Sequence, residues 1–292
     1  MHWVALALAS ALLSAAAAVA QKRTLFRVHA LEFSFLVSAA VLLMSSFVPF
    51  TADVLALTPR AFAVLGVKSV VGGIAFLLVM LSLERNPISG ALPLMGLTPA
   101  VTGVLAAALL GDHLRPVEWA GLGLMTAGAW ALEASPRGGF WRPFAEVFGS
   151  GRYRFMLAAV LLFALSSVGD KLLVTGMKVP PNVVLFHQHV VYTAVFGVML
   201  LVRRVPAAVV GRAAREHAPM VLAIAALTLG YRFFQLQATR TGPVALVLAV
   251  KRSSILFAGL SGGRLFAEQR LLPRVLGALC IVAAGFLFLG RE

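Results

Sequence analysis

Long apolar runs, separated by short polar connectors, make up most of the chain. A helix that crosses a bilayer needs about 20 mostly apolar residues, and runs of this length recur from one end of the sequence to the other. They predict an all-α, polytopic membrane protein with ten transmembrane helices. The predicted spans are residues 3–20, 30–48, 61–83, 88–110, 116–133, 155–175, 183–202, 218–238, 243–265 and 271–289.

Two connectors are longer than the others. Residues 134–154 are rich in Gly, Pro and Arg and fall near the middle of the chain. The segment Arg203–His217 is predicted to form a short amphipathic helix on the membrane surface. Within the span 88–110, Pro93 and Pro99 predict an interruption of the helix, because proline has no amide hydrogen to donate.

Composition agrees with the run lengths. Hydrophobic residues make up 60% of the 292 positions and charged residues 12%, and the mean hydropathy is +0.94. Soluble proteins carry about a quarter charged residues, so a soluble enzyme is excluded. The net charge of +14 comes from short basic clusters between apolar runs, as in loops of membrane proteins. These clusters do not form the continuous basic face that a nucleic-acid partner needs.

The first apolar run has a second interpretation as a cleaved signal peptide, because Ala18-Val19-Ala20 resembles a small-residue cleavage site. No Lys or Arg precedes this run, however, and the basic pair Lys22-Arg23 follows it. A retained first helix is therefore the favoured prediction. The single cysteine, Cys280, lies within an apolar stretch, so no intrachain disulfide is possible and no metal site or cofactor is predicted.

The two halves of the chain resemble each other weakly. A shift of 156 residues superposes Pro87 on Pro243, Gly103 on Gly259 and Asp112 on Glu268 without a gap. The predicted domains are a five-helix repeat in residues 1–134, a linker in 135–154 and a second repeat in 155–292. Because each repeat has an odd number of spans, the second must cross the bilayer in the opposite direction. Two inverted five-helix repeats are a known transporter architecture, with the binding site between them.

Several basic residues lie inside the predicted spans. Lys251 and Arg252 lie near the middle of the span 243–265, where a charge costs at least about 3 kcal/mol on insertion scales. Lys68 and Arg232 are further candidates for substrate binding, Arg232 together with the neighbouring Tyr231. Glu32, Glu84 and Asp170 are the acids in or near the spans. Lys171 lies near a helix end, from which its amine can reach the interface.

Three residues are candidates for proton coupling: Glu32, His187 and His189. A histidine titrates near neutral pH, and an ionisable group inside a membrane is a functional hypothesis by default. The two histidines are two residues apart and so lie on different faces of a helix, which is unfavourable for binding one metal ion. Simple hydrogen bonding within the helix bundle is the alternative for all three.

One motif points to a different class of protein. Gly259-Leu260-Ser261-Gly262-Gly263 matches the nucleophile pattern G-x-S-x-G, but the strand–turn–helix context of soluble hydrolases is absent from the prediction. An intramembrane serine hydrolase would also need a histidine base on a later helix, and the span 271–289 contains none. This function remains a distant alternative.

The ten spans, the segment Pro99 with Gly111-Asp112-His113-Leu114, and the matching Ala267-Glu268 resemble the EamA branch of the drug/metabolite transporter superfamily. The stretch Val250–Phe257 is similar to the Lys-Arg segment of phosphate-antiporting plastid relatives, which implies an anion site. The resemblance also implies that both termini are cytoplasmic. The loop charges favour the opposite orientation, because the loops after the odd-numbered spans hold most of the Lys and Arg.

Together these features predict a secondary transporter, not an enzyme, that moves a small anionic or carboxylate-bearing metabolite across a membrane, expected to be the bacterial inner membrane. Its partners would be the metabolite, the lipid bilayer and a coupling proton or ion, and not nucleic acid. An exporter of amino acids or hydrophobic compounds and a flippase for a phosphate-linked lipid are the alternatives within transport.

Overall fold

The computed structural model describes residues 2–54, 57–86, 92–131 and 153–254, together with Cys280 and Ala283. This part of the chain forms helices and no strand. The elements are α1 (His2–Thr24), α2 (Ala30–Met44), α3 (Val48–Thr51), α4 (Pro59–Arg85), the 3-10 helix η1 (Leu92–Leu97), α6 (Thr98–Leu110), α7 (Pro116–Ala131), α9 (Arg154–Lys171), the π-helical turn η2 (Leu172–Gly176), α10 (Pro181–Val202), α11 (Ala207–Thr241) and α12 (Val244–Lys251). The all-α prediction is correct for these residues.

Six of the predicted spans are helical segments long and apolar enough to cross a membrane: the first three and the sixth to eighth. The fourth predicted span is not one α-helix over its described residues, which form the 3-10 helix η1 up to Leu97 and α6 from Thr98. Pro99 lies in the first turn of α6, where the missing amide hydrogen costs nothing. The fifth span is the shorter helix α7.

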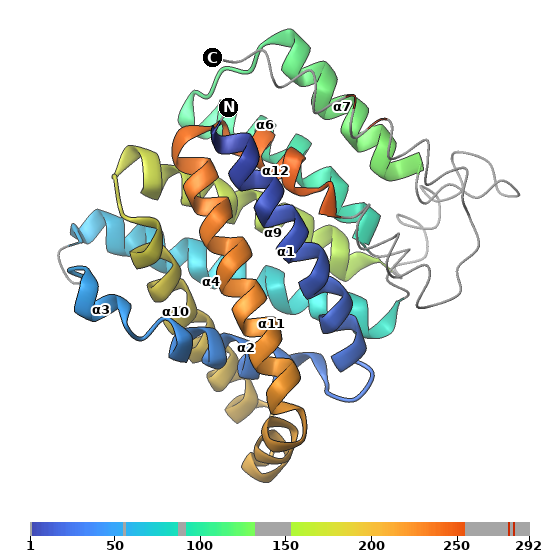
Figure 1. The fold of residues 1–292 in the computed structure, drawn as a ribbon, viewed down its shortest axis with the longest axis vertical. Helices are drawn as coiled ribbons and strands as arrows, with labels where there is room; N and C mark the ends of the chain where they lie inside the picture. Colours follow the sequence, from blue (N-terminus) through green and yellow to red (C-terminus); the bar gives the residue numbers. More distant parts are fainter. Residues whose placement is uncertain are drawn as a thin grey trace, which may run out of the picture.

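The prediction of a separate surface helix at Arg203–His217 is wrong. From Ala207 this segment is the beginning of α11, which continues as one helix to Thr241. In Figure 1 the end of α10 and the first turns of α11 extend beyond the other helices. The ninth predicted span also differs from one continuous helix, because α12 ends at Lys251 and a turn follows at Arg252 and Ser253. The tenth span and most of the linker 135–154 lie outside the described residues.

The most extensive helix contacts join a helix of the first half of the sequence to a helix of the second half. Helix α1 packs along α11, and α4 packs along α9; Figure 1 shows α1 and α11 side by side. These two pairs join the first predicted span to the eighth and the third to the sixth. In the predicted repeat the first span corresponds to the sixth and the third to the eighth, so exchanging the halves turns each pair into the other. Trp3 lies next to Gly242 and Leu13 next to Gly230, which makes α1 and α11 antiparallel.

Glycine allows the closest approach between α4 and the second half. A Cβ atom on Gly72 would lie 2.5 Å from the Tyr192 hydroxyl and 2.7 Å from Ser166 Oγ. On α9, a Cβ on Gly169 would lie 2.8 Å from Lys68 Cβ. Small residues let helices pack closely in lipid, and here they bring the Lys68 side chain against α9.

Two lysines, Lys22 buried and Lys171 half-buried, bind the carboxyl ends of helices in corresponding ways. Lys22, in the last turn of α1, donates to the Leu83 and Asn86 carbonyls at 2.5 and 3.0 Å. Lys171, at the end of α9, donates to the Thr239 and Gly242 carbonyls at 3.2 and 2.9 Å. A cation is favoured at the carboxyl end of a helix by the unpaired carbonyls and the helix dipole.

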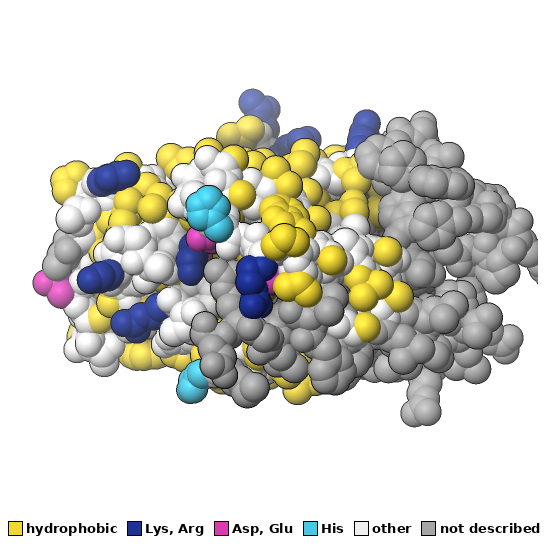
Figure 2. All heavy atoms as spheres, turned by 90° about the horizontal axis from the view of Figure 1, so that it is seen from above, with side chains coloured by type: hydrophobic (Ala, Val, Ile, Leu, Met, Phe, Trp, Pro, Cys, Tyr) yellow, Lys and Arg dark blue, Asp and Glu magenta, His cyan; other side chains and the backbone are white. Residues whose placement is uncertain are grey.

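These four carbonyls are related by the sequence repeat. The shift of 156 residues that superposes the two halves carries Leu83 onto Thr239 and Asn86 onto Gly242. Lys171, which was expected to extend to the membrane interface, donates its hydrogen bonds to these carbonyls at the end of α11. Figure 2 shows hydrophobic side chains spread over the visible face, with single Lys and Arg side chains among them. This distribution suits a protein surrounded by lipid.

Candidate functional site

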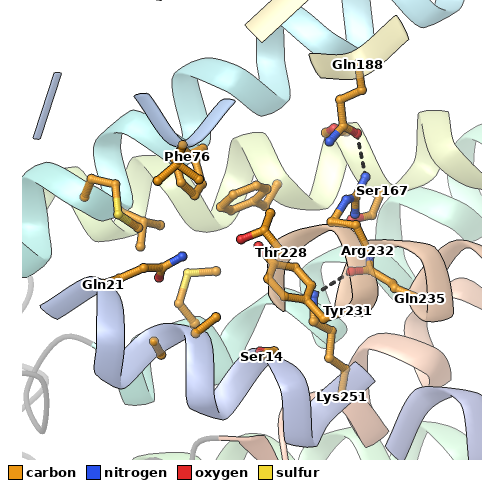
Figure 3. Close-up of a pocket in the computed structure, with 18 of the residues that line it drawn as sticks. Ser14, Gln21, Phe76, Ser167, Gln188, Thr228, Tyr231, Arg232, Gln235 and Lys251 are labelled. Atoms are coloured by element: carbon orange, nitrogen blue, oxygen red, sulfur yellow. Dashed lines mark hydrogen bonds between the residues drawn. The ribbon is translucent and has the colours of Figure 1, made fainter. Parts of the chain in front are cut away.

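A cavity of about 140 Å³ lies at the centre of the bundle, between helices of both halves. From the first half, α1, α2, α4 and η1 contribute its walls; from the second half, α9, α10, α11 and α12 do. The lining is part apolar and part polar, and Figure 3 shows Arg232, Gln235 and Lys251 close together in it. Phe76, Met80 and Phe163 contribute apolar surface, and the charged lining residues come from α9, α11 and the end of α12.

The first polar group is an ion cluster around Asp170, whose residue is 1% exposed. Lys68 Nζ lies 2.6 Å from Asp170 Oδ1, and Arg232 Nη2 lies 3.0 Å from Oδ2. The Gln188 side-chain oxygen accepts from the same two bases, at 2.7 Å from Lys68 and 2.6 Å from Arg232. One carboxylate and one amide thus link α4 of the first half to α11 of the second.

The second polar group surrounds Lys251 and Arg252. Lys251 Nζ donates to Gln235 Oε1 at 2.5 Å and lies 4.3 Å from the centre of the Tyr231 ring, which is a cation–π distance. Arg252 Nη2 donates to Thr98 Oγ1 at 3.2 Å, while its buried Nε has no hydrogen-bond partner among the described residues. Figure 3 shows the hydrogen bond between Lys251 and Gln235 beside Tyr231.

The charges of the two groups do not balance. Asp170 is the only acid among the described residues that line the cavity, and both of its oxygens are already paired with Lys68 and Arg232. Lys251 and Arg252 are bound by an amide, a hydroxyl and an aromatic ring, none of which carries a negative charge. A buried cation without a counter-charge is costly, so this side of the cavity favours an anion.

The structure separates the residues that were predicted for the site. Lys251, Arg252, Arg232, Tyr231 and His189 line the cavity. Lys68 reaches the cavity only through Asp170 and Gln188. Lys251 and Arg252 are adjacent at the end of α12, and both line the same cavity.

Glu32 and His187 are not among the residues that line the cavity. Glu32 is buried in the first turn of α2, where the helix dipole favours a negative charge. His187 Nδ1 bonds to its own helix at the Val183 carbonyl, 3.0 Å away, and its ring packs against Phe62. His189 Nδ1 bonds in the same way to the Leu185 carbonyl, at 2.9 Å.

Glu84 forms a pair outside the cavity, at the end of α4. Its Oε1 lies 2.9 Å from Nδ1 of His29, the exposed residue that precedes α2. The hydrogen bond to Glu84, with a further contribution from the negative charge of Glu32, raises the pKa of His29 above its usual value. This pair is therefore strongest when His29 is protonated.

Sequence analysis missed three polar partners: Gln188, Gln235 as the acceptor for Lys251, and Thr98. Gln188 lies between the two histidines that were singled out, and four residues before Tyr192 on the same helix face. Buried amides in an apolar span are a usable signal, since they must find partners. The described residues contain no cluster of His, Cys, Asp and Glu that could hold a metal ion, and Ser261 lies outside them.

The helices and the partly polar cavity define a class: an integral membrane protein with a polar site between the helices of a bundle. The comparison with protein families specifies it further. Residues 1–133 match the EamA-like transporter family. This part of the chain is therefore similar to a family of membrane transporters within the drug/metabolite transporter superfamily.

Comparison with solved structures supports the same fold over a longer range. The chain is similar to a protein whose structure is described as "Crystal structure of protein", with a TM-score of 0.70 and 18% sequence identity. The match covers 98% of this chain and 95% of that one. A search of the curated proteins finds no match.

Proposed function

We propose that the protein is a secondary transporter for a small anionic or carboxylate-bearing metabolite, which binds in the central cavity between two inverted five-helix halves. The single observation that carries this proposal is the charge imbalance at the cavity: Lys251 and Arg252 face it without a carboxylate partner among the described residues. The protein would act in a membrane such as the bacterial inner membrane.

The pairing of helices supports the inverted repeat, with halves at residues 1–134 and 155–292 and a linker at 135–154. The packing of α1 on α11 and of α9 on α4 is what a twofold axis in the membrane plane would generate. The two lysine caps, related by the sequence shift, follow the same exchange. In such folds the substrate site lies near the middle of the bilayer, and the halves rock around it.

Size supports a compact substrate. An apolar cavity of about 150 Å³ in another protein binds benzene, and the cavity here is about 140 Å³. A ligand of that size is comparable to inorganic phosphate or a short carboxylic acid. Arg252 can bind a carboxylate or phosphate through two parallel hydrogen bonds, while Lys251 acts as a point charge.

The proposed cycle uses the anion as the missing counter-charge. Binding pairs Lys251 and Arg252, so that the halves can close around a more nearly neutral site than the empty one. Arg232 lines the same cavity and has a buried Nε without a partner in the described structure, which makes it a supporting contact. His189 is the proton-coupling candidate that lines the cavity.

The test is exchange in proteoliposomes loaded with a mixture of phosphorylated and carboxylated metabolites. Wild type is compared with Lys251→Gln and Arg252→Gln, and with Arg60→Gln, a matched change at an exposed arginine outside the cavity. We expect wild type and Arg60→Gln to exchange an anion and the two cavity variants to lose at least about tenfold in rate, since each charge-assisted contact contributes about 1.5–3 kcal/mol. Full activity in folded cavity variants would refute the anion site.

A zwitterionic amino acid is the second candidate, because the cavity also offers the Asp170 carboxylate and the apolar surfaces of Phe76 and Met80. The basic residues would then bind the substrate carboxylate and Asp170 its ammonium group. Competition separates the two candidates: amino acids, but not the corresponding carboxylic acids without an amine, would inhibit uptake. A Ser261→Ala variant that keeps full activity in the same assay would count against the hydrolase alternative.

A further inference from the structure

We propose that a groove on the outer side of α1 and α11 binds one anionic phospholipid, independently of the transported substrate. The groove has a volume of about 540 Å³ and is separate from the central cavity. It is apolar along its length and basic at one end. Its lining residues are Leu12, Ala15, Ala16, Val19, Ala20, Arg23 and Met220.

The length of the groove matches one leaflet of a bilayer. It runs along α1 from Leu12 to Arg23, and at 1.5 Å per residue this distance is about 16 Å. Half of a hydrocarbon core of about 30 Å is about 15 Å. With Arg23 at the level of the headgroups, Leu12 lies near the middle of the bilayer, and the groove has the length of one acyl chain.

Arg23 supplies the charge that selects the headgroup. Its side chain is exposed and forms no hydrogen bond or ion pair with any described residue, whereas the neighbouring Lys22 is buried and bonds to the end of α4. Arg27, Arg212 and Arg215 are exposed at the same end of the α1–α11 pair. Basic groups at a membrane surface attract anionic lipids, and an arginine binds phosphate well.

A single helix, α1, separates the groove from the central cavity. Ala16, Val19 and Ala20 of α1 line the groove, while Ser14, Ala18 and Gln21 of the same helix line the central cavity. A lipid held in the groove therefore packs against the outer side of a cavity wall. The consequence is that the bound lipid stabilises the position of α1 against α11.

The experiment measures lipid retention by native mass spectrometry and thermal unfolding of the purified protein, with phosphatidylglycerol or phosphatidylcholine added to the detergent. We expect wild type to retain one phosphatidylglycerol and to be stabilised by it more than by phosphatidylcholine. Arg23→Gln should weaken phosphatidylglycerol binding about fivefold, the contribution of one basic residue near a charged membrane surface. Ala16→Phe fills the groove and should abolish retention of both lipids.

Matched variants control for general charge and for added bulk. Arg27→Gln removes an exposed charge at the same end outside the groove, and Leu8→Phe adds an aromatic ring on α1 outside the groove; both should retain phosphatidylglycerol as wild type does. The proposal is overturned if Arg27→Gln weakens binding as much as Arg23→Gln, or if Ala16→Phe changes nothing. A dimer that disappears in Ala16→Phe would assign the groove to a second copy of the chain and also overturn it.

Discussion

The two basic groups at the cavity look alike in sequence but differ in structure. Lys68 and Arg232 share one carboxylate and one amide, and their cluster joins the two halves of the chain. Lys251 and Arg252 are held by an amide, a hydroxyl and an aromatic ring. In the first group both cations are paired with a carboxylate, whereas the second has no carboxylate among the described residues.

This difference predicts that one group contributes mainly to the stability of the protein and the other mainly to substrate binding. Removing the shared carboxylate of the first group leaves two buried cations unpaired, which is strongly destabilising. Removing a cation that has no counter-ion relieves an unfavourable charge. Its loss should therefore weaken ligand binding more than it lowers the stability of the protein. We therefore assign the Asp170 cluster to holding the halves together and the Lys251–Arg252 group to the substrate.

The most severe test of the comparison is Asp170→Asn. It leaves Lys68 and Arg232 without their carboxylate, and breaking a buried ion pair costs about 3–5 kcal/mol. We expect a large fall in the thermal unfolding temperature of the purified protein and a low yield. Glu216→Gln, which neutralises an exposed acid on α11, should unfold as wild type does. Equal stability of the two variants would show that the cluster is not structural.

A direct contrast compares the two lysines by the same substitution. Lys68→Met removes hydrogen bonds to Asp170 and Gln188 and should destabilise the protein by about 1.5–3 kcal/mol. Lys251→Met should stay within about 1 kcal/mol of wild type, because replacing a buried charge by a hydrophobic side chain is often neutral. Unfolding in denaturant measures both. If Lys251→Met were the less stable variant, the assignment of roles would be reversed.

The close approach of α4 to the second half can be tested without changing a charge. The Gly72→Ala methyl group would meet Tyr192 and Ser166 at distances below contact, and forced overpacking costs about 1–3 kcal/mol. Gly66→Ala lies on the same helix with open space around it and should be neutral or slightly stabilising. Thermal unfolding of the pair should show this difference, and equal melting temperatures would argue against close packing at Gly72.

The smallest expected effect concerns an exposed ion pair, which serves as a reference for the buried cluster. The pKa of His29 is raised by Glu84, so the stabilisation is complete below the unfolded-state pKa of about 6.5 and is lost as the pH rises through the higher folded-state pKa. Exposed pairs contribute only about 0.2–1 kcal/mol. The melting temperature of wild type should fall slightly more than that of Glu84→Gln between pH 6 and pH 9, and an identical pH dependence would contradict the pairing.

Sequence patterns identified the helices more reliably than the ends of the helices. Apolar run length located the six long helices among the predicted spans, because burial in lipid requires about 20 apolar residues whatever their neighbours are. Run length could not show that the segment from Ala207 continues into the next span as one helix. Charged residues such as Arg212 and Arg215 fit a separate surface helix as well as they fit an extension of the span. Nor could run length place the turn after Lys251, which depends on the residues packed around it.

For the candidate site, the sequence predicted which residues are charged but not how they pair. The cost of an intramembrane charge pointed to Lys68, Arg232, Lys251 and Arg252, and Asp170 was recognised as an available acid. Which base meets Asp170 depends on the rotation of α4 and α11 about their axes, and no run length contains that information. For the same reason Lys22, which reads as a loop charge, is buried against the end of α4.

Helix α11 has 35 residues, with Pro219 inside it, and at 1.5 Å per residue it is about 52 Å long. Because Pro219 has no amide hydrogen, the Arg215 carbonyl lacks its helix bond. The helix is therefore mechanically weakest where its projecting first turns join the part that packs on α1. A load on those first turns, from an antibody fragment for example, would bend the helix at this joint. Tyr231 and Arg232 lie three turns beyond the joint and would be shielded from the load.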